Sequence, residues 1–246
     1  MTKSKKTKII IISGVVTAVL VLSLVLAALY LGDYYRAADG AIASFDPEEG
    51  ITVTENADGS LVFSPEDPIA GFIFYPGGKV EHNAYQQLMA ELARDGVLTV
   101  LVKMPFNLAV LDVNAADGIK ESFPEIDSWY IGGHSLGGSM AASYLEAHSE
   151  EFDGLVLLAA YSTVDLSATD LEVLSVYGSE DLVLDLERYD ECCANLPGGF
   201  TEAVITGGNH AYFGIYGEQE GDGEADIPNS VQIRVTARRI MELIEE

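Results

Sequence analysis

Ser135 lies in a glycine-rich run whose residue types and spacing could carry out acyl transfer. Residues 132–138 read Gly-Gly-His-Ser-Leu-Gly-Gly and follow the short apolar run 129–131. In a G-x-S-x-G turn between a buried strand and a helix, the strained serine backbone exposes the hydroxyl, and only glycine fits the close contacts on either side. The stretch 136–152 is predicted to be a helix whose N-terminal N–H groups face the charge that develops on the substrate. This pattern favours a nucleophilic Ser135 over a serine in a purely structural turn.

A nucleophilic serine on such a turn requires an acid and then a histidine further along the chain. The alternating run 171–177 predicts a strand, which leads into Gly-Ser-Glu-Asp at 178–181. A second predicted strand, 202–205, is followed by Thr-Gly-Gly-Asn-His, which places His210 after it. Because the carboxyl ends of parallel strands meet at one edge of a sheet, these groups should share that edge with Ser135. Their order along the chain therefore fits a hydrolase with a serine, an acid and a histidine.

Backbone groups upstream of the serine add to this pattern. The predicted strand 71–75 runs into Pro-Gly-Gly-Lys at 76–79, where backbone without side chains can direct an N–H group at an oxyanion. His134 is next to the serine, but neighbours on a strand point to opposite faces. We therefore expect His134 to pack beside the turn rather than to act as the base.

These motifs resemble the α/β-hydrolase superfamily, and more narrowly its small lidless members of the dienelactone-hydrolase-like, fold-5 type. The resemblance covers roughly residues 69–246 and rests on the motifs at 75–79, 132–138, 177–181 and 207–210. Two features depart from the family pattern. Pro76 stands where many relatives carry histidine, and the short stretch 163–170 leaves little room for the usual crossover helix.

The resemblance implies a role for each of three residues. Ser135 would be the nucleophile, His210 the base, and Asp181 the carboxylate that orients the histidine. Glu180 and Asp185 are the alternatives for the acid, and we favour Asp181 because the family motif ends there.

The same resemblance implies an oxyanion hole formed by the backbone N–H groups of Leu136 and Gly78, with Lys79 as the alternative to Gly78. Water would complete hydrolysis, so neither a metal nor an organic cofactor is expected. The acidic stretch 220–226 is similar to a calcium-binding loop, but it lacks the expected glycine and the closing acid. We interpret this stretch as a flexible acidic loop.

The remaining pattern alternates strands with helices, which predicts an α/β fold with a mostly parallel sheet and helices on both faces. Residues 51–54 and 61–63 flank Asn-Ala-Asp-Gly and predict a hairpin at the sheet edge. The other predicted strands are 71–75, 97–104, 128–131, 154–160, 171–177 and 202–205. The predicted helices are 85–92, 107–121, 136–152, 184–196 and a last helix that opens at Pro228.

The N-terminal segment differs from the rest of the chain. Residues 9–32 contain no charged side chain and exceed the roughly 20 residues that a helix needs to cross a bilayer. Lysines precede this run and Asp33 is the first acidic residue, so the positive-inside rule places the N-terminus in the cytoplasm and the remainder outside. We predict a cytoplasmic basic tail over 1–8, a transmembrane signal anchor over 9–32, a juxtamembrane spacer over 33–50 and an α/β-hydrolase domain over 51–246. A cleaved signal peptide and a buried core helix are the alternatives for the apolar run.

The part of the chain after the apolar run is strongly acidic. It holds all 39 acidic residues but only nine of the 13 basic ones, which gives it a formal charge of −30. This charge disfavours nucleic acid and polyanionic substrates as partners. Cys192 and Cys193 are the only cysteines and are adjacent, so they close no loop, and they are either free buried thiols or a vicinal disulfide.

Together these features predict a single-pass protein of the cell membrane with an extracytoplasmic serine hydrolase domain. The expected substrate is a small molecule that carries a carboxylic ester. The alternatives are a peptidase or an acyltransferase with the same triad, and a catalytically silent hydrolase scaffold that binds a ligand or a partner. Neither the fold nor the motif names the substrate.

Overall fold

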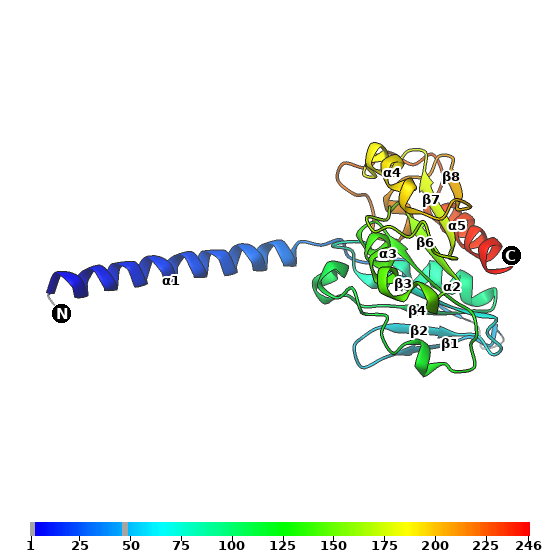
Figure 1. Ribbon diagram of the computed structural model, residues 1–246, viewed down its shortest axis with the longest axis horizontal. Coiled ribbons are helices and arrows are strands. Elements are labelled where there is room, and N and C mark those ends of the chain that lie inside the picture. Colours follow the sequence, from blue (N-terminus) through cyan, green and yellow to red (C-terminus); the bar gives the residue numbers. More distant parts are fainter. Residues whose placement is uncertain (1–2, 46–48) are drawn as a thin grey trace. The chain divides into compact units, whose positions relative to one another are not determined.

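A computed structural model describes residues 3–45 and 49–246 (Figure 1). The chain divides into two compact units, Met1–Tyr34 and Tyr35–Glu246. The first unit is one helix, α1 (Lys3–Gly32). Its part Ile12–Gly32 has a mean hydropathy of 2.6 and exposed side chains, so α1 is a candidate membrane span.

The described residues of the second unit form an eight-stranded sheet in the order β1-β2-β4-β3-β5-β6-β7-β8. The strands are β1 (Thr52–Glu55), β2 (Leu61–Ser64), β3 (Ala70–Tyr75), β4 (Val97–Leu101), β5 (Trp129–His134), β6 (Gly154–Leu158), β7 (Glu172–Gly178) and β8 (Thr201–Ile205). The β1–β2 and β2–β4 pairs are antiparallel, whereas the pairs from β4 through β8 are parallel. The prediction of a mostly parallel α/β sheet with a hairpin at its edge is therefore confirmed.

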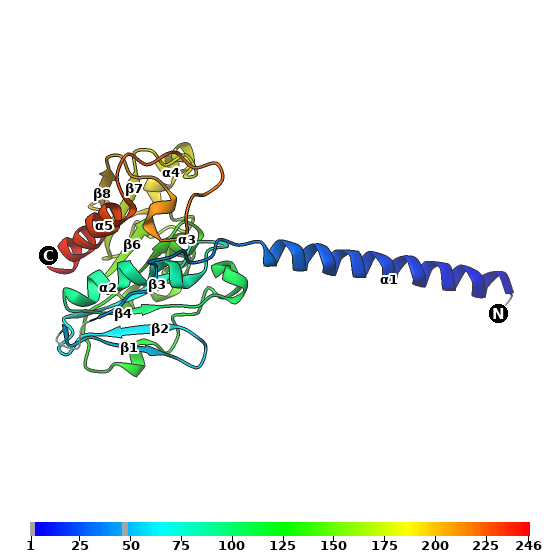
Figure 2. The same ribbon diagram turned by 180° about the vertical axis from the view of Figure 1, so that it is seen from behind.

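Two hydrophobic cores lie on opposite faces of the sheet, because alternate residues of a buried strand point to opposite sides. Phe72 of β3 belongs to the core that α2 (Gln86–Arg94) and α5 (Asn229–Ile244) cover. Its neighbour Ile73 belongs to the core under α3 (Leu136–His148). Figure 2 shows α2 and α5 in front of the sheet, and Figure 1 shows α3 on the other side. Helices therefore cover both faces, as predicted.

The stretch 107–121, predicted to be a helix, forms a series of tight turns instead. Its helical residues are Asn107, which ends the 3₁₀ segment Pro105–Asn107, and the short 3₁₀ segments Ala109–Leu111 and Lys120–Ser122. Backbone hydrogen bonds in this stretch link residues three apart, and Gly118 takes a left-handed φ of 76°. The prediction was wrong because the Tyr75 hydroxyl takes two backbone groups of this stretch, the Val113 carbonyl and the Ala116 N–H, and because the left-handed Gly118 interrupts a helix.

Two other predicted helices begin or end inside their predicted limits. After its last residue, α3 continues as a 3₁₀ turn, Ser149–Glu151. The helix expected over 184–196 is α4 (Leu186–Cys192), followed by the 3₁₀ turn Cys193–Asn195. Between β6 and β7 the described chain contains no helix, as the short stretch 163–170 led us to expect.

The segment after α1 lies against the α/β unit from Tyr35 onward. Tyr35 forms a parallel β-bridge with Val80, and its N–H donates to the Lys79 carbonyl at 2.8 Å. Ala41 is completely buried. The compact unit of the structure therefore begins within the stretch that we expected to be a spacer.

Candidate active site

Ser135 occupies the sharp turn between β5 and α3 with a strained backbone. Its φ and ψ are 51° and −123°, a conformation that costs a non-glycine residue about 1–3 kcal/mol. The Ser135 N–H donates to the Leu158 carbonyl of β6 at 2.9 Å, which holds the turn on the sheet. The Ser135 side chain makes no capping hydrogen bond to α3. The hydroxyl is therefore not engaged by the helix that follows it.

Glycine is required on both sides of Ser135 because the backbone of neighbouring segments lies very close. A Cβ atom on Gly133 would lie 2.5 Å from the Tyr75 carbonyl oxygen, and one on Gly137 would lie 2.2 Å from the same oxygen. A Cβ atom on Gly138 would lie 2.6 Å from that of Ala160. Such contacts are far below van der Waals distance. The spacing of the motif therefore reflects the packing of the turn against β3 and β6.

His210 and Asp181 meet at the carboxyl ends of β8 and β7. His210 Nδ1 lies 2.9 Å from Asp181 Oδ2, and the exposed fractions of the two side chains are 2% and 0%. Asp181 Oδ1 accepts the backbone N–H groups of Val183 at 2.9 Å and Leu184 at 2.8 Å. The acid is thus held by its own turn and directed at the imidazole.

The alternative acids make other contacts. Glu180 accepts a hydrogen bond from the Ser179 hydroxyl at 2.8 Å and is half-buried at the surface. Asp185 caps α4 by accepting the Arg188 N–H at 3.0 Å. Of the three candidate acids, the structure brings only Asp181 to His210.

Ser135 and His210 line the same cavity of about 250 Å³. The other residues that line it are Leu136, Ser139, Ala159, Ala160, Tyr161, Val183, Leu184 and Asp185. His210 Nε2 is buried and has no hydrogen-bond partner among the described residues. Because the Nδ1–H group donates a hydrogen bond to the Asp181 carboxylate, the neutral ring in this tautomer carries its lone pair on Nε2. This nitrogen can therefore accept a proton from a group in the cavity.

Gly78, one of the two residues expected at the oxyanion hole, lies beside the side chain of the other, Leu136. A Cβ atom on Gly78 would lie 2.9 Å from Leu136 Cδ2. Within the described part of the chain, neither the Gly78 nor the Leu136 N–H donates a hydrogen bond. The Lys79 N–H donates to the Asn107 carbonyl at 2.7 Å. Gly78 and Leu136 are thus available to a substrate oxygen, whereas the alternative, Lys79, is engaged.

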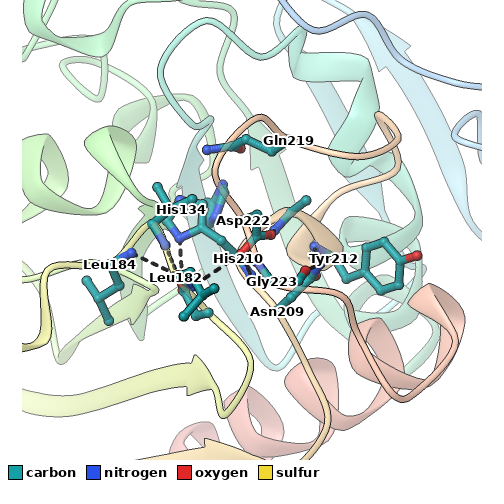
Figure 3. Close-up of polar contacts among 12 residues, drawn as sticks. His134, Leu182, Leu184, Asn209, His210, Tyr212, Gln219, Asp222 and Gly223 are labelled. Carbon is teal, nitrogen blue, oxygen red and sulfur yellow. Dashed lines mark hydrogen bonds and ion pairs between the residues drawn. The ribbon is translucent and has the colours of Figure 1, made fainter.

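His134 lies behind His210 and is tied to Tyr85. The Gly77 N–H donates to Tyr85 Oη at 3.1 Å, and Tyr85 Oη lies 2.8 Å from His134 Nδ1. The His134 and His210 rings lie 4.6 Å apart, and Figure 3 shows the two residues next to each other.

Both groups of this pair are neutral. Burial raises the pKa of Tyr85, so the phenol keeps its proton and donates a hydrogen bond to His134 Nδ1. Burial, and second the nearby His210, lower the pKa of His134 well below the usual range. His134 does not line the cavity of Ser135, in keeping with the expectation that it packs beside the turn. Nothing in the sequence pointed to Tyr85, which stands 49 residues before its partner.

Neither a metal site nor a disulfide is found in residues 3–45 and 49–246. No group of three or more histidine, cysteine, aspartate or glutamate side chains in these ranges could hold a metal ion. Cys192 is buried, Cys193 is half-buried, and both are free thiols.

Comparison with known proteins places this geometry in a family. Residues 71–234 match the model of a family described as the alpha/beta hydrolase family. The matched range spans the Ser135 turn, Asp181 and His210. No curated protein sequence matches the chain.

Solved structures share the fold at low sequence identity. Dienelactone hydrolase from Anabaena variabilis is 13% identical with a TM-score of 0.60, and the match covers 78% of this chain and 98% of that one. Carboxyl esterase 2 from the fungus Tuber melanosporum is 13% identical with a TM-score of 0.58, over 86% and 91% of the two chains. Est1E from Butyrivibrio proteoclasticus, solved with ferulic acid, is 12% identical with a TM-score of 0.57, over 80% and 97%.

Proposed function

Because this chain belongs to the alpha/beta hydrolase family, we propose that it is a serine hydrolase that cleaves carboxylic esters through an acyl-enzyme. One observation supports this proposal above the others. His210 is held by Asp181 through Nδ1, while its unpartnered Nε2 is buried at the cavity that Ser135 also lines. A histidine arranged in this way can activate a serine hydroxyl.

The proposed reaction has two halves. His210 Nε2 takes the proton of Ser135 Oγ as the oxygen attacks the ester carbonyl carbon, and the imidazolium then gives this proton to the leaving alcohol. A water molecule next gives a proton to Nε2 and attacks the acyl carbon. The imidazolium then returns this proton to Ser135 Oγ as the acyl–oxygen bond breaks, which releases the acid and restores the serine. Asp181 stays ionised and stabilises the imidazolium in both halves.

The negative charge on the tetrahedral oxygen would be stabilised by the N–H groups of Gly78 and Leu136. Each such donor contributes about 3 kcal/mol to transition-state stabilisation in other hydrolases. The N-terminus of α3 adds a favourable dipole at the same place. This chemistry needs neither a metal nor an organic cofactor.

We propose small, soluble acyl groups as substrates rather than long-chain lipids. The cavity holds about 250 Å³, and the described chain between β6 and β7 provides no helix that could cover a long apolar chain. Hydrolysis rates across p-nitrophenyl esters should therefore fall beyond medium chain length. A maximum at palmitate with activation at a lipid interface would exclude this substrate class.

We also propose that α1 anchors the protein in the membrane with the hydrolase unit outside the cytoplasm. The lysines before the apolar run and the acidic unit after it support this orientation. Protease added to intact spheroplasts should digest the hydrolase unit and leave the anchor. Protection of the unit until the cells are lysed would contradict the orientation.

The hydrolase proposal itself is tested on the full chain in detergent micelles. The wild type should hydrolyse a short ester and react with a fluorophosphonate probe at Ser135, and Ser135→Ala should remove both, with activity falling by about 10⁴ or more. A panel of esters, thioesters, lactones and amides distinguishes an esterase from a peptidase. If a folded wild type neither turns over any member nor reacts with the probe, the chain is a binding scaffold instead.

A further inference from the structure

The carboxylate of Asp222 accepts hydrogen bonds from four backbone N–H groups. Its Oδ1 accepts from His210 at 3.2 Å, from Leu182 at 3.4 Å and from Gly223 at 2.8 Å. Its Oδ2 accepts from Ala211 at 2.8 Å. Figure 3 shows Asp222 beside His210. The acidic stretch 220–226, interpreted from sequence as a flexible loop, thus lies against the turn that carries the histidine.

These contacts join the histidine turn to the acid turn. Leu182 directly follows Asp181, so the carboxylate of Asp222 ties the backbone after the acid to the backbone of His210. The side chain of Asp181 joins the same two turns through the imidazole. The next two N–H groups after Leu182 are those of Val183 and Leu184, and both donate to Asp181. Two carboxylates therefore fix the relative position of the turns. Asp181 binds the side chain of His210, and Asp222 binds its backbone.

The loop around Asp222 is itself held at several points. Asn209 Nδ2 donates to the Gly223 carbonyl at 2.8 Å, and the Asp222 N–H donates to the Gln219 carbonyl at 3.2 Å. A Cβ atom on Gly223 would lie 1.9 Å from the Glu180 carbonyl oxygen, so only glycine permits this approach to the acid turn. The close contact between this loop and the acid turn thus explains why a glycine stands at position 223 and an aspartate at position 222.

We propose that Asp222 is a positioning residue that sets the geometry of His210 against Asp181. This inference rests on the proposed hydrolase function. Asp222 does not line the cavity of Ser135, so it acts through the backbone of His210 and not on the substrate. An ionised acceptor forms stronger hydrogen bonds than a neutral one, which suits a carboxylate to this position.

The test compares three variants of the full chain in detergent micelles: Asp222→Ala, Asp222→Asn and the control Glu224→Gln. Glu224 belongs to the same stretch and is exposed. Displacement of a catalytic group by about 1 Å costs about 10²-fold in rate, so we expect Asp222→Ala to lower kcat by about that factor, with KM changed less than about threefold. Asp222→Asn keeps the oxygen that serves His210 and Leu182 but places an amide at Ala211, so its kcat should fall by about tenfold. The control should match the wild type, although it removes the same charge.

Proton NMR adds a measurement that a general loss of stability would not change. The Nδ1 proton between His210 and Asp181 should give a strongly downfield resonance in the wild type and in Glu224→Gln. In Asp222→Ala this resonance should shift or broaden at temperatures where the thermal melt shows a fully folded protein. An unchanged resonance with unchanged kcat in a folded Asp222→Ala protein would overturn the positioning role.

Other outcomes are decided in the same way. If Asp222→Ala does not fold, Asp222→Asn decides, and a kcat within about twofold of the wild type overturns the proposal. A general effect of charge would lower kcat equally in Glu224→Gln, which also contradicts it. The failure of the hydrolase proposal looks different, because the wild type itself would then lack turnover and probe labelling.

Discussion

The serine turn is positioned by close packing of backbone, whereas the paired histidine and acid turns combine such packing with hydrogen bonds to carboxylates. Ser135 is fixed by close packing of backbone, since a Cβ atom on Gly137 would lie 2.2 Å from the Tyr75 carbonyl oxygen. His210 and Asp181 are held by hydrogen bonds to the carboxylates of Asp181 and Asp222. The bonds from His210, Ala211 and Leu184 to these carboxylates are 2.8–3.2 Å long. A packed turn cannot accept an extra atom, whereas a hydrogen-bonded turn can lose one contact and keep the others. We therefore expect substitutions to act abruptly in the first region and gradually in the second.

The largest effect is expected from the loss of His210, because His210 and Ser135 are proposed to work as one unit. His210→Ala should lower kcat/KM for a short ester by about 10⁴, because the serine hydroxyl then has no base. The Ser135→Ala/His210→Ala double variant should cost little further activity, since neither residue works without the other. Steady-state kinetics and fluorophosphonate labelling measure both effects.

Thermal melting of each variant is the control, so that lost activity is not confused with lost structure. Additive losses in the double variant would show that Ser135 and His210 act independently. That result would remove the basis for treating the serine turn and the histidine turn as parts of one site.

Asp181→Asn should lower kcat severely but by less than the loss of the histidine itself, because the acid orients and stabilises the imidazolium without transferring the proton. The amide would still fill the space between His210 and the turn at Val183. Glu180→Gln is the matched control, since Glu180 contacts the Ser179 hydroxyl and not the histidine. If Glu180→Gln were the damaging change and Asp181→Asn harmless, the acid would be wrongly assigned.

Much of the fold and the outline of the site could be predicted because the signals are local. The periodicity of strands and helices predicted the parallel sheet, which the structure confirms, and the family match confirms the resemblance. The glycines next to Ser135 are neighbours of the residue that they serve, so their spacing is visible in a short window. The roles of Ser135, His210 and Asp181 stay predictions that the geometry supports.

The polar half of the site was less predictable because its contacts join distant segments. Tyr85 reaches His134 across 49 positions, and Asp222 reaches Leu182 across 40. A carboxylate that serves backbone N–H groups has the same sequence signature as one in a solvated loop. The helix predicted over 107–121 failed for a related reason, since the backbone of Val113 and Ala116 is bonded to the hydroxyl of Tyr75, about 40 positions earlier in the chain.

A substitution that adds an atom to the packed serine turn should affect stability more than the loss of any single hydrogen bond in the paired turns. Gly137→Ala should lower the free energy of unfolding by about 3 kcal/mol, because the new methyl group would meet the carbonyl oxygens of Tyr75 and Pro76. Gly198→Ala is the control, since a Cβ atom there meets nothing within 4 Å, and it should change stability by less than about 0.5 kcal/mol. Urea unfolding curves give both values. Equal stability of the two variants would contradict the steric account.

His134 lies between the two regions and should make stability depend on pH. Its pKa is lowered in the fold by burial and by His210, so below about pH 6.5 the unfolded chain binds a proton that the folded protein does not. Stability is therefore complete above that pH and falls as the pH decreases, by at most about 1.4 kcal/mol per pH unit. His134→Gln should reduce this slope between pH 6.5 and 5, as measured by urea unfolding at each pH. An identical slope in the variant would show that other groups cause the loss, such as His82, whose pKa is also lowered by burial.

The smallest expected effect comes from Tyr35, which links the segment around Lys79 to the loop that carries Asp222. Its backbone is bonded to Lys79 and Glu81, next to Gly78, whereas its hydroxyl accepts the Glu220 N–H at 3.1 Å on the loop that carries Asp222. Tyr35→Phe removes only the hydroxyl, at a cost of about 0.5–1 kcal/mol, because the Glu220 N–H can bond to water instead. We expect kcat to fall by less than about threefold with KM unchanged, because the histidine turn loosens slightly while the backbone contacts of Lys79 and Glu81 are kept. A larger loss in kcat would mean that the segment after α1 controls the position of His210. A rise in KM alone would mean that Tyr35 affects substrate binding, so that its contacts with the histidine side and with the substrate side could not be separated.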